Sequence, residues 1–229
     1  MSKALRLAIA AAAVLVVAVV AYQFLPGRPG PGGQATPTPE PTAVVNLPGS
    51  GPIEAGTYRL AFGPPVLITL PPGWVSTGTG VRKHLEEPNE IALDGYTTSI
   101  RVFADACESA DTDTMVGPTV DDLIAALLAQ ENSEVSDPVD VTVGGLPGKR
   151  FEITTPTGLD LDSCSIGALQ IWVDATRSNY LAGIGDAAAI VYAADTPTGR
   201  LLFVLAGSDE SATDVAERDA IVASLDVVE

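Results

Sequence analysis

The sequence predicts an α+β domain in which two main helices pack on a largely antiparallel β-sheet, preceded by one transmembrane helix. Beyond residue 56, several short segments alternate apolar and polar residues, which is typical of half-buried strands. Two longer segments repeat apolar residues at helical spacing behind a capping residue. The expected order is strands, a helix, six strands and a second helix, which implies α+β architecture with helices packed on a largely antiparallel sheet.

An uncharged run of nineteen residues, 7–25, predicts the transmembrane helix. Its length just suffices for the roughly 30 Å hydrocarbon core of a bilayer. Lys3 and Arg6 precede the run, so the positive-inside rule places the N-terminus in the cytoplasm and the rest of the chain outside. The alternative is a signal peptide cleaved after residues 19–21, which would make the remainder a secreted protein. No cysteine lies just behind the run, which excludes lipid attachment at that point.

Residues 26–52 have the composition of a disordered stalk. They hold eight prolines and six glycines in twenty-seven residues, with repeated Thr-Pro pairs that favour an extended polyproline conformation. We therefore divide the chain into a cytoplasmic tail and transmembrane anchor (1–25), a Pro/Gly/Thr-rich stalk (26–52) and an extracytoplasmic α+β domain (53–229).

The domain opens with two predicted strands, 57–62 and 66–70. The second ends at the sequence Pro-Pro-Gly-Trp, because two consecutive prolines cannot join a central ladder. We expect Trp74 to fold back onto the core. A third strand is predicted at 97–103, where apolar residues alternate again.

The clearest helix is predicted at 120–130. Thr119 and Asp122 have the spacing of a capping box, and apolar residues follow at i, i+3, i+4, i+7 and i+8. We expect Leu123, Ile124 and Leu127 to be almost fully buried.

Six further strands and a final helix complete the prediction. The strands are 139–143, 149–155, 168–173, 180–184, 189–194 and 200–206. Turn residues at 195–199 predict an antiparallel hairpin for the last two. The helix runs from about Ser211 to Leu225, and we expect Val215, Val222 and Leu225 on its core side.

Several short features together resemble the PsbP-like α/β/α sandwich superfamily, in its bacterial envelope-protein branch. They are Leu-Pro-Pro-Gly-Trp at 70–74, the mid-chain helix, Val-Gly-Gly-Leu-Pro-Gly at 143–148 leading into a strand, and a final helix ending in Ile-Val-Ala-Ser-Leu at 221–225. The resemblance covers residues 57–229. It implies a PsbP-like sandwich fold and a binding or scaffolding role, with no shared active site. The lipid-attachment cysteine of the superfamily's mycobacterial lipoproteins has no counterpart here.

Charge and cysteines narrow the function. Nine of twelve basic and twenty-eight of twenty-nine acidic residues lie beyond residue 50, which leaves that part with a net charge of −19 and excludes nucleic acid as a partner. The only two cysteines, Cys107 and Cys164, lie in the expected oxidising compartment, so we expect a disulfide. Two unpaired buried thiols are the alternative.

No motif in the sequence points to catalysis. The single histidine, His84, stands among charged residues and lacks a nucleophile motif, and no phosphate-binding glycine loop has the required spacing. We expect no enzyme activity, no catalytic residue and no cofactor.

Two weaker ligand sites are considered. Acidic residues flank both cysteines and carry oxygens suited to calcium, although no EF-hand pattern is present and a solvated acidic loop is the simpler interpretation. These candidates are Asp105, Glu108, Asp111, Asp113, Asp160 and Asp162. Tyr180 and Tyr192 are candidates for lining a groove.

We therefore expect a single-pass membrane protein whose domain binds a protein or small ligand outside the cytoplasm. Three lysines amid abundant Ala, Val, Gly and Asp suit a bacterial envelope protein from a GC-rich genome. The alternatives are an envelope hydrolase that uses carboxylates and a displayed domain with a purely structural role.

Overall fold

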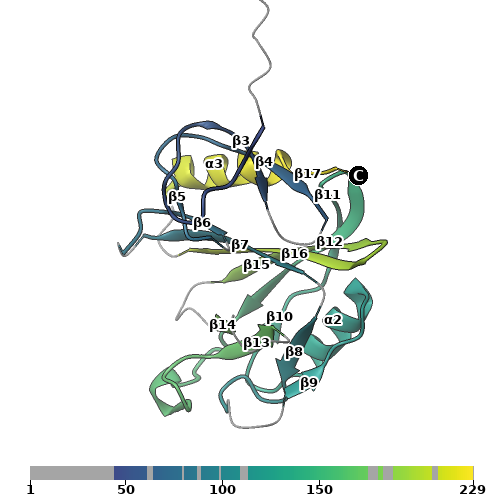
Figure 1. Ribbon diagram of the computed structural model, residues 1–229. Helices are drawn as coiled ribbons and strands as arrows, with labels where there is room; N and C mark the ends of the chain where they lie inside the picture. The colour runs from purple at the N-terminus through teal and green to yellow at the C-terminus, as the bar shows by residue number, and fades with distance from the viewer. Residues whose placement is uncertain are drawn as a thin grey trace, which may run out of the picture. The chain divides into compact units, whose positions relative to one another are not determined.

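A nine-stranded antiparallel sheet runs through the middle of the domain in the computed structural model (Figure 1). The structure describes residues 44–60, 64–78, 80–86, 89–97, 99–108, 113–174, 180–182, 188–207 and 211–228. The sheet strands follow the order β10-β12-β15-β16-β7-β6-β5-β2, and β11 pairs with β12 beside that path. Their bounds are β2 Gly51–Pro52, β5 Val75–Ser76, β6 Gly80–Lys83, β7 Ile91–Thr97, β10 Glu134–Val135, β11 Val139–Val143, β12 Leu146–Thr154, β15 Ala189–Thr196 and β16 Gly199–Gly207.

Two smaller four-stranded sheets and two α-helices complete the α+β fold. One sheet has the order β1-β3-β4-β17 and the other β14-β13-β8-β9. The helices are α2 (Val120–Leu128) and α3 (Ala212–Ala223), and a short 3-10 helix spans Leu161–Ser163. The strand bounds are β1 Val45–Asn46, β3 Gly56–Leu60, β4 Val66–Leu70, β8 Ile100–Phe103, β9 Asp113–Met115, β13 Gln170–Asp174, β14 Tyr180–Ala182 and β17 Asp226–Val227.

The central sheet separates two hydrophobic cores. The hairpin β3–β4 and helix α3 cover one face, whereas α2 and the sheet that contains β8 and β13 lie on the other (Figure 1). Strand β16 is apolar along most of its length because successive side chains point into opposite cores. We call them the α3 core (including Leu60, Ile68, Trp74, Leu201, Phe203, Leu205, Ile221) and the α2 core (including Ile100, Leu123, Leu127, Phe151, Trp172, Leu202, Val204).

Helix α2 forms as the sequence predicts. Thr119 is its N-cap, and both hydrogen bonds of the capping box with Asp122 are present. Leu123, Ile124 and Leu127 are buried, which confirms the predicted apolar face. The β15–β16 hairpin and the burial of Trp74, only 1% exposed, are confirmed as well.

The predicted core side of α3 is partly wrong. Ile221 and Leu225 are buried and Val222 packs against the α3 core, but Val215 is only half-buried and is not part of that core. In the first turn of the helix, Asp214 is buried instead. Its carboxylate forms an ion pair with Lys83 on the side where Val215 was expected to pack.

The sequence did not predict β6 and β7, two strands in the middle of the sheet. Residues 97–103 do not form one strand: Thr97 ends β7 in the central sheet, and Ile100 begins β8 in a smaller sheet. Strand β7 pairs with β16 along its whole length, and β6 pairs with β7 in turn. Charged residues interrupt the apolar pattern of 80–94, so the sequence did not predict these strands. The structure accommodates the charges because Arg82 and Asp94 form a bidentate ion pair across β6 and β7.

The domain begins before the predicted boundary at residue 53. Strand β1 pairs in parallel with β3, β2 pairs with β5, and the Ser76 hydroxyl donates to the Pro48 carbonyl. Backbone hydrogen bonds thus hold residues 44–52, although their composition is that of a stalk. The predicted membrane helix at 7–25 lies outside the described residues. Within the part of the chain that is described, no helix is long and apolar enough to cross a membrane.

Candidate functional site

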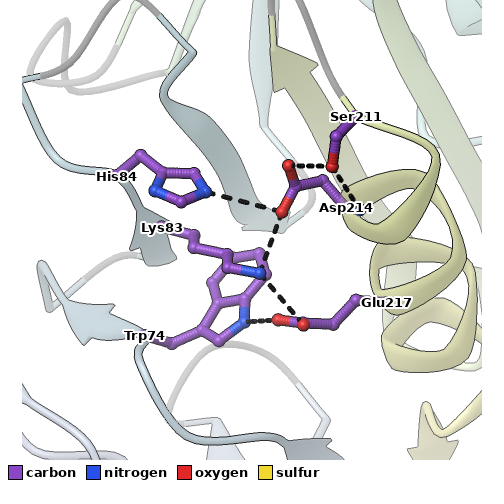
Figure 2. Close-up of polar contacts among 6 residues, drawn as sticks. All are labelled: Trp74, Lys83, His84, Ser211, Asp214 and Glu217. Atoms are coloured by element: carbon purple, nitrogen blue, oxygen red, sulfur yellow. Dashed lines mark hydrogen bonds and ion pairs between the residues drawn. The ribbon is translucent and has the colours of Figure 1, made fainter.

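A group of charged and polar side chains lies where the N-terminal turns of α3 meet β6. Figure 2 shows its members, which we call the Lys83 cluster: Trp74, Lys83, His84, Ser211, Asp214 and Glu217. Trp74 follows the turn after β4. Lys83 ends β6, and His84 comes directly after it. The remaining three members lie at the start of α3. The members come from three segments that are separated in sequence, so tertiary packing brings the cluster together.

Lys83 lies between two carboxylates. Its Nζ is 2.9 Å from Asp214 Oδ1 and 3.0 Å from Glu217 Oε2. Burial alone would lower the pKa of Lys83, but the hydrogen bonds to these carboxylates outweigh burial and raise the pKa. Glu217 also accepts a hydrogen bond from the indole Nε1 of Trp74 at 2.6 Å. The buried indole is thereby satisfied by a charged acceptor.

Asp214 is the centre of the cluster. The Ser211 hydroxyl donates to Asp214 Oδ2 at 2.6 Å and, as the N-cap of α3, accepts from the Asp214 backbone N–H. Together with Lys83, this hydroxyl holds the pKa of Asp214 well below its usual range. His84 Nε2 lies 3.4 Å from Asp214 Oδ1. Asp214 therefore stays ionised at neutral pH.

The arrangement of serine, histidine and aspartate differs from that of a hydrolase triad. In a triad the histidine takes the serine proton and the aspartate orients the histidine. Here Ser211 and His84 approach Asp214 from different sides, and the Ser211 hydroxyl donates to the carboxylate (Figure 2). An ionised, ion-paired Asp214 is also a poor proton donor. The geometry suits a polar clamp that fixes α3 to β6.

A pocket of about 250 Å³ lies farther along α3. Its described lining includes Ala188, just before β15, Ile190 of β15, and Leu205 and Gly207 of β16. Arg218 of α3 lines it as well. We call it the α3 pocket. Among the described residues that line it, four are small or apolar and one is a cation, which makes it a candidate ligand site.

The predicted disulfide is present. Cys107 and Cys164 are bonded with a Cα–Cα distance of 4.6 Å, inside the expected range, and both residues are buried. The bridge is reinforced by the Ser165 backbone N–H, which donates to the Cys107 carbonyl.

The acidic residues near the disulfide are engaged in local contacts. Asp105 accepts hydrogen bonds from the Cys107 backbone and from the Asn132 side chain. Asp113 pairs with Arg101 at 2.8 Å. Asp160 caps the 3-10 helix by accepting from the Asp162 backbone.

Three calcium candidates remain. Glu108 and Asp162 are exposed near the bridge, and Asp111 lies outside the described residues. Among the side chains that are described, no three metal-ligating groups converge on one point.

The two tyrosines belong to different sheets. Tyr180 lies in β14, and its side chain is outside the described part; Tyr192 lies in β15, half-buried against the α3 core. The groove thus stays a prediction that the structure leaves open.

Sequence reasoning missed Lys83, Asp214, Glu217 and Arg218 as site residues. One signal was available: Asp214, Glu217 and Ile221 share one face of α3, so an acidic pair precedes the buried isoleucine on the sheet-facing side. An acidic residue on such a face requires a cationic partner, which the sequence does not identify.

Comparisons with known proteins give a likeness of structure and none of sequence. No protein-family model matches the chain, and no curated protein matches it. A solved structure that it resembles is the solution structure of cyanobacterial PsbP (CyanoP) from Synechocystis sp. PCC 6803. The likeness covers 71% of this chain and 86% of that chain, at 13% sequence identity and a TM-score of 0.32.

Proposed function

We propose that this chain is a non-catalytic binding domain on the outer side of a cell membrane, where a single N-terminal helix anchors it. The observation that carries the proposal is the buried Cys107–Cys164 disulfide. Such bridges form and persist in oxidising compartments and are rare in the cytosol. An exported domain is therefore the best explanation of the bond.

The sequence before the domain supports the anchor. Residues 7–25 are uncharged, and Lys3 and Arg6 precede them. A Pro/Gly/Thr-rich stalk would then hold the domain at a distance from the bilayer.

The geometry of the Lys83 cluster and of the α3 pocket favours binding over catalysis. The Lys83 cluster keeps Asp214 ionised in a clamp between a helix and a strand, whereas the α3 pocket offers an apolar floor beside a cation. A concave site with few polar groups is the usual form of a small-ligand site.

The test is the location of the full chain in a bacterial host. We expect the chain in the membrane pellet, resistant to an alkaline wash, with the domain cut by protease added to spheroplasts. Replacing Val16 and Val17 by arginine should release it from the pellet or block its export, while replacing both by leucine should change nothing.

Mass spectrometry of the purified chain decides between anchor and signal peptide. An intact N-terminal segment supports the anchor. A soluble product that lacks the first twenty or so residues would overturn it in favour of a secreted domain. Protection of the domain from external protease would overturn the extracytoplasmic location itself.

A further inference from the structure

We propose that strand β11 docks an extended, cationic segment of a partner protein, which adds to the central sheet as a further antiparallel strand. This inference deepens the binding role proposed above by naming the chemistry of the partner, and it rests on that role. Three features carry it: a free main-chain edge, two strand faces of different character, and the charge around the edge.

The hairpin β11–β12 determines which main-chain groups of β11 point outward. The two strands pair residue for residue without a bulge, and Val143 and Leu146 flank a Gly-Gly turn with φ values of 57° and 84°. These values suit a two-residue type I′ turn, which a hydrogen-bonded pair closes. Hydrogen-bonded pairs alternate along an antiparallel ladder. Asp140 and Thr142 therefore direct their N–H and C=O groups away from β12.

These outward groups form a free edge of the central sheet. Among the described strands only β12 pairs with β11, and within the described chain no backbone hydrogen bond reaches Asp140 or Thr142 from the outer side. β11 has five residues, whereas the other strands at the edges of the three described sheets have two or three. A regular edge of this length is a template for one more strand, which is how many proteins bind extended peptides.

The two faces of β11 differ in chemistry. On the side of the α3 core, Val141 packs against that core and Val139 is 56% exposed. On the opposite side, Thr142 is exposed and the Asp140 side chain is 88% exposed. The side chains of an added strand would lie beside these residues on each face. The edge therefore suits a segment in which apolar and cationic residues alternate.

Charge selects a cationic partner over a second copy of this chain. Residues 134–143 include three exposed acidic residues, Glu134, Asp137 and Asp140, and no basic residue. Lys149 of β12 pairs with Asp140, but an ion pair with so exposed a carboxylate is weak, and the carboxylate can accept from a second cation.

The same charge opposes pairing between two copies. Beyond residue 50 the chain has a net charge of −19, so a second copy is repelled and a cationic segment is attracted. Charged side chains on edge strands are a common means of preventing edge-to-edge association. Asp140 therefore disfavours self-pairing while it matches a lysine on the partner.

The probe is a fluorescently labelled peptide of seven residues, Lys-Val-Lys-Val-Lys-Val-Lys, titrated at low salt into the full chain in nonionic detergent micelles. The peptide with glutamate in place of every lysine is the control for charge. We expect saturable anisotropy with a dissociation constant on the order of 0.1 mM. The glutamate peptide should bind at least about tenfold more weakly. Backbone amide NMR should show the largest shifts at Asp140 and Thr142.

Methylated peptides separate main-chain pairing from charge attraction. In an antiparallel pair the residues opposite Asp140 and Thr142 place their side chains on the same face, so they are the lysines of the peptide. Methylating the lysine backbone nitrogens removes the donors that point at β11 and should weaken binding at least about tenfold. Methylating the valine nitrogens alters the outer side only and should leave binding within about threefold.

Four variants locate the edge. Thr142→Pro removes one outward N–H without breaking the ladder to β12, and it should weaken the lysine peptide at least about fivefold. Thr142→Ala keeps that N–H and should bind like wild type. Asp140→Lys should reverse the preference toward the glutamate peptide, which keeps the test decisive if Thr142→Pro perturbs the fold. Glu54→Lys makes the same change of charge at an exposed residue outside β11 and should leave the preference unchanged.

Three results would overturn the proposal: no saturable binding of the lysine peptide, equal binding of the two methylated peptides, or binding that survives both Thr142→Pro and Asp140→Lys. Self-association that Thr142→Pro abolishes, without peptide binding, would overturn it in favour of a second copy at this edge. None of these results bears on the membrane location, which the fractionation experiment decides separately. Failure of the partner class and failure of the proposed function are thus distinguishable.

Discussion

At the scale of single residues, one lysine connects three distant parts of the chain. Lys83 at the end of β6 binds both Asp214 and Glu217 of α3, and Glu217 also holds the indole of Trp74. Each group satisfies the polar atoms of another, so removing one member leaves a partly buried charge without its partner. The N-terminal half of α3 is therefore fixed by charge. Its C-terminal half is fixed by Ile221 in the apolar core, together with Leu225 just beyond the helix end.

The cluster predicts a specific dependence of stability on pH. The pKa of Asp214 is lower in the folded protein than in the unfolded chain, so its contribution is present above its ordinary pKa of about 3.9 and is lost as pH falls below it. The pKa of Lys83 is raised, so its contribution is lost only as pH rises beyond its ordinary value of about 10.4. Full stabilisation is expected between about pH 5 and pH 9.

Asp214→Asn tests this dependence. We expect a lower melting temperature than wild type from pH 5 to pH 9, with the difference shrinking below pH 4. The measurement is thermal unfolding by circular dichroism, with Asp219→Asn as the control because Asp219 is exposed and outside the cluster. A difference that persists unchanged at pH 2.5 would show that the Asp214 carboxylate is not what stabilises this contact.

At the scale of elements, helix α2 begins at a point fixed by two other strands. Its first N–H, on Val120, donates to Asp195 Oδ1 at the end of β15. Arg200 of β16, only 1% exposed, donates to the carbonyls of Gly117 and Thr119 just before the helix. Burial lowers the pKa of Arg200, against the opposing effect of Asp195. The capping box and these tertiary contacts act on the same turn.

Thr119→Ala should destabilise the domain by about 1 kcal/mol, since it removes the cap hydroxyl that accepts from Asp122 N. Thr119→Ser keeps that hydroxyl and should lie within a few tenths of wild type. Urea denaturation of the two variants measures the difference. Equal stability of both variants would mean that Asp195 and Arg200 alone position the helix start.

At the scale of the whole molecule, the disulfide joins segments on one side of the central sheet that are distant in sequence. Cys107 follows β8, and Cys164 follows the 3-10 helix, 57 residues later. Gln170 N, at the start of β13, donates to the Ala106 carbonyl beside the bridge. The bond therefore secures the sheet β14-β13-β8-β9 over the α2 core.

The double variant Cys107→Ser/Cys164→Ser should lose up to about 4 kcal/mol of stability, the chain-entropy value for a loop of this length. Chemical denaturation of the oxidised wild type and the variant measures it, and wild type treated with reductant should resemble the variant. A loss below 1 kcal/mol would show that packing of the α2 core holds this side of the domain by itself.

Local sequence determined the elements whose residues satisfy their own requirements. Thr119 and Asp122 complete a cap within one turn, the apolar stripe of α2 has a helical period, and turn residues at 195–199 close the β15–β16 hairpin. Cys107 and Cys164 are the only two cysteines of the sequence, so the composition alone predicts their pairing. The cap, the apolar stripe and the turn need no knowledge of distant segments.

Tertiary structure alone decided where charged residues lie. Arg82 and Asp94 are tolerated in β6 and β7 because each neutralises the other across the strands, and Asp214 faces inward because Lys83 meets it there. The α3 pocket likewise brings Arg218 of α3 together with residues at the neighbouring ends of β15 and β16. Apolar burial and capping are properties of local order, whereas a charge is stabilised by a partner that folding brings from far along the chain.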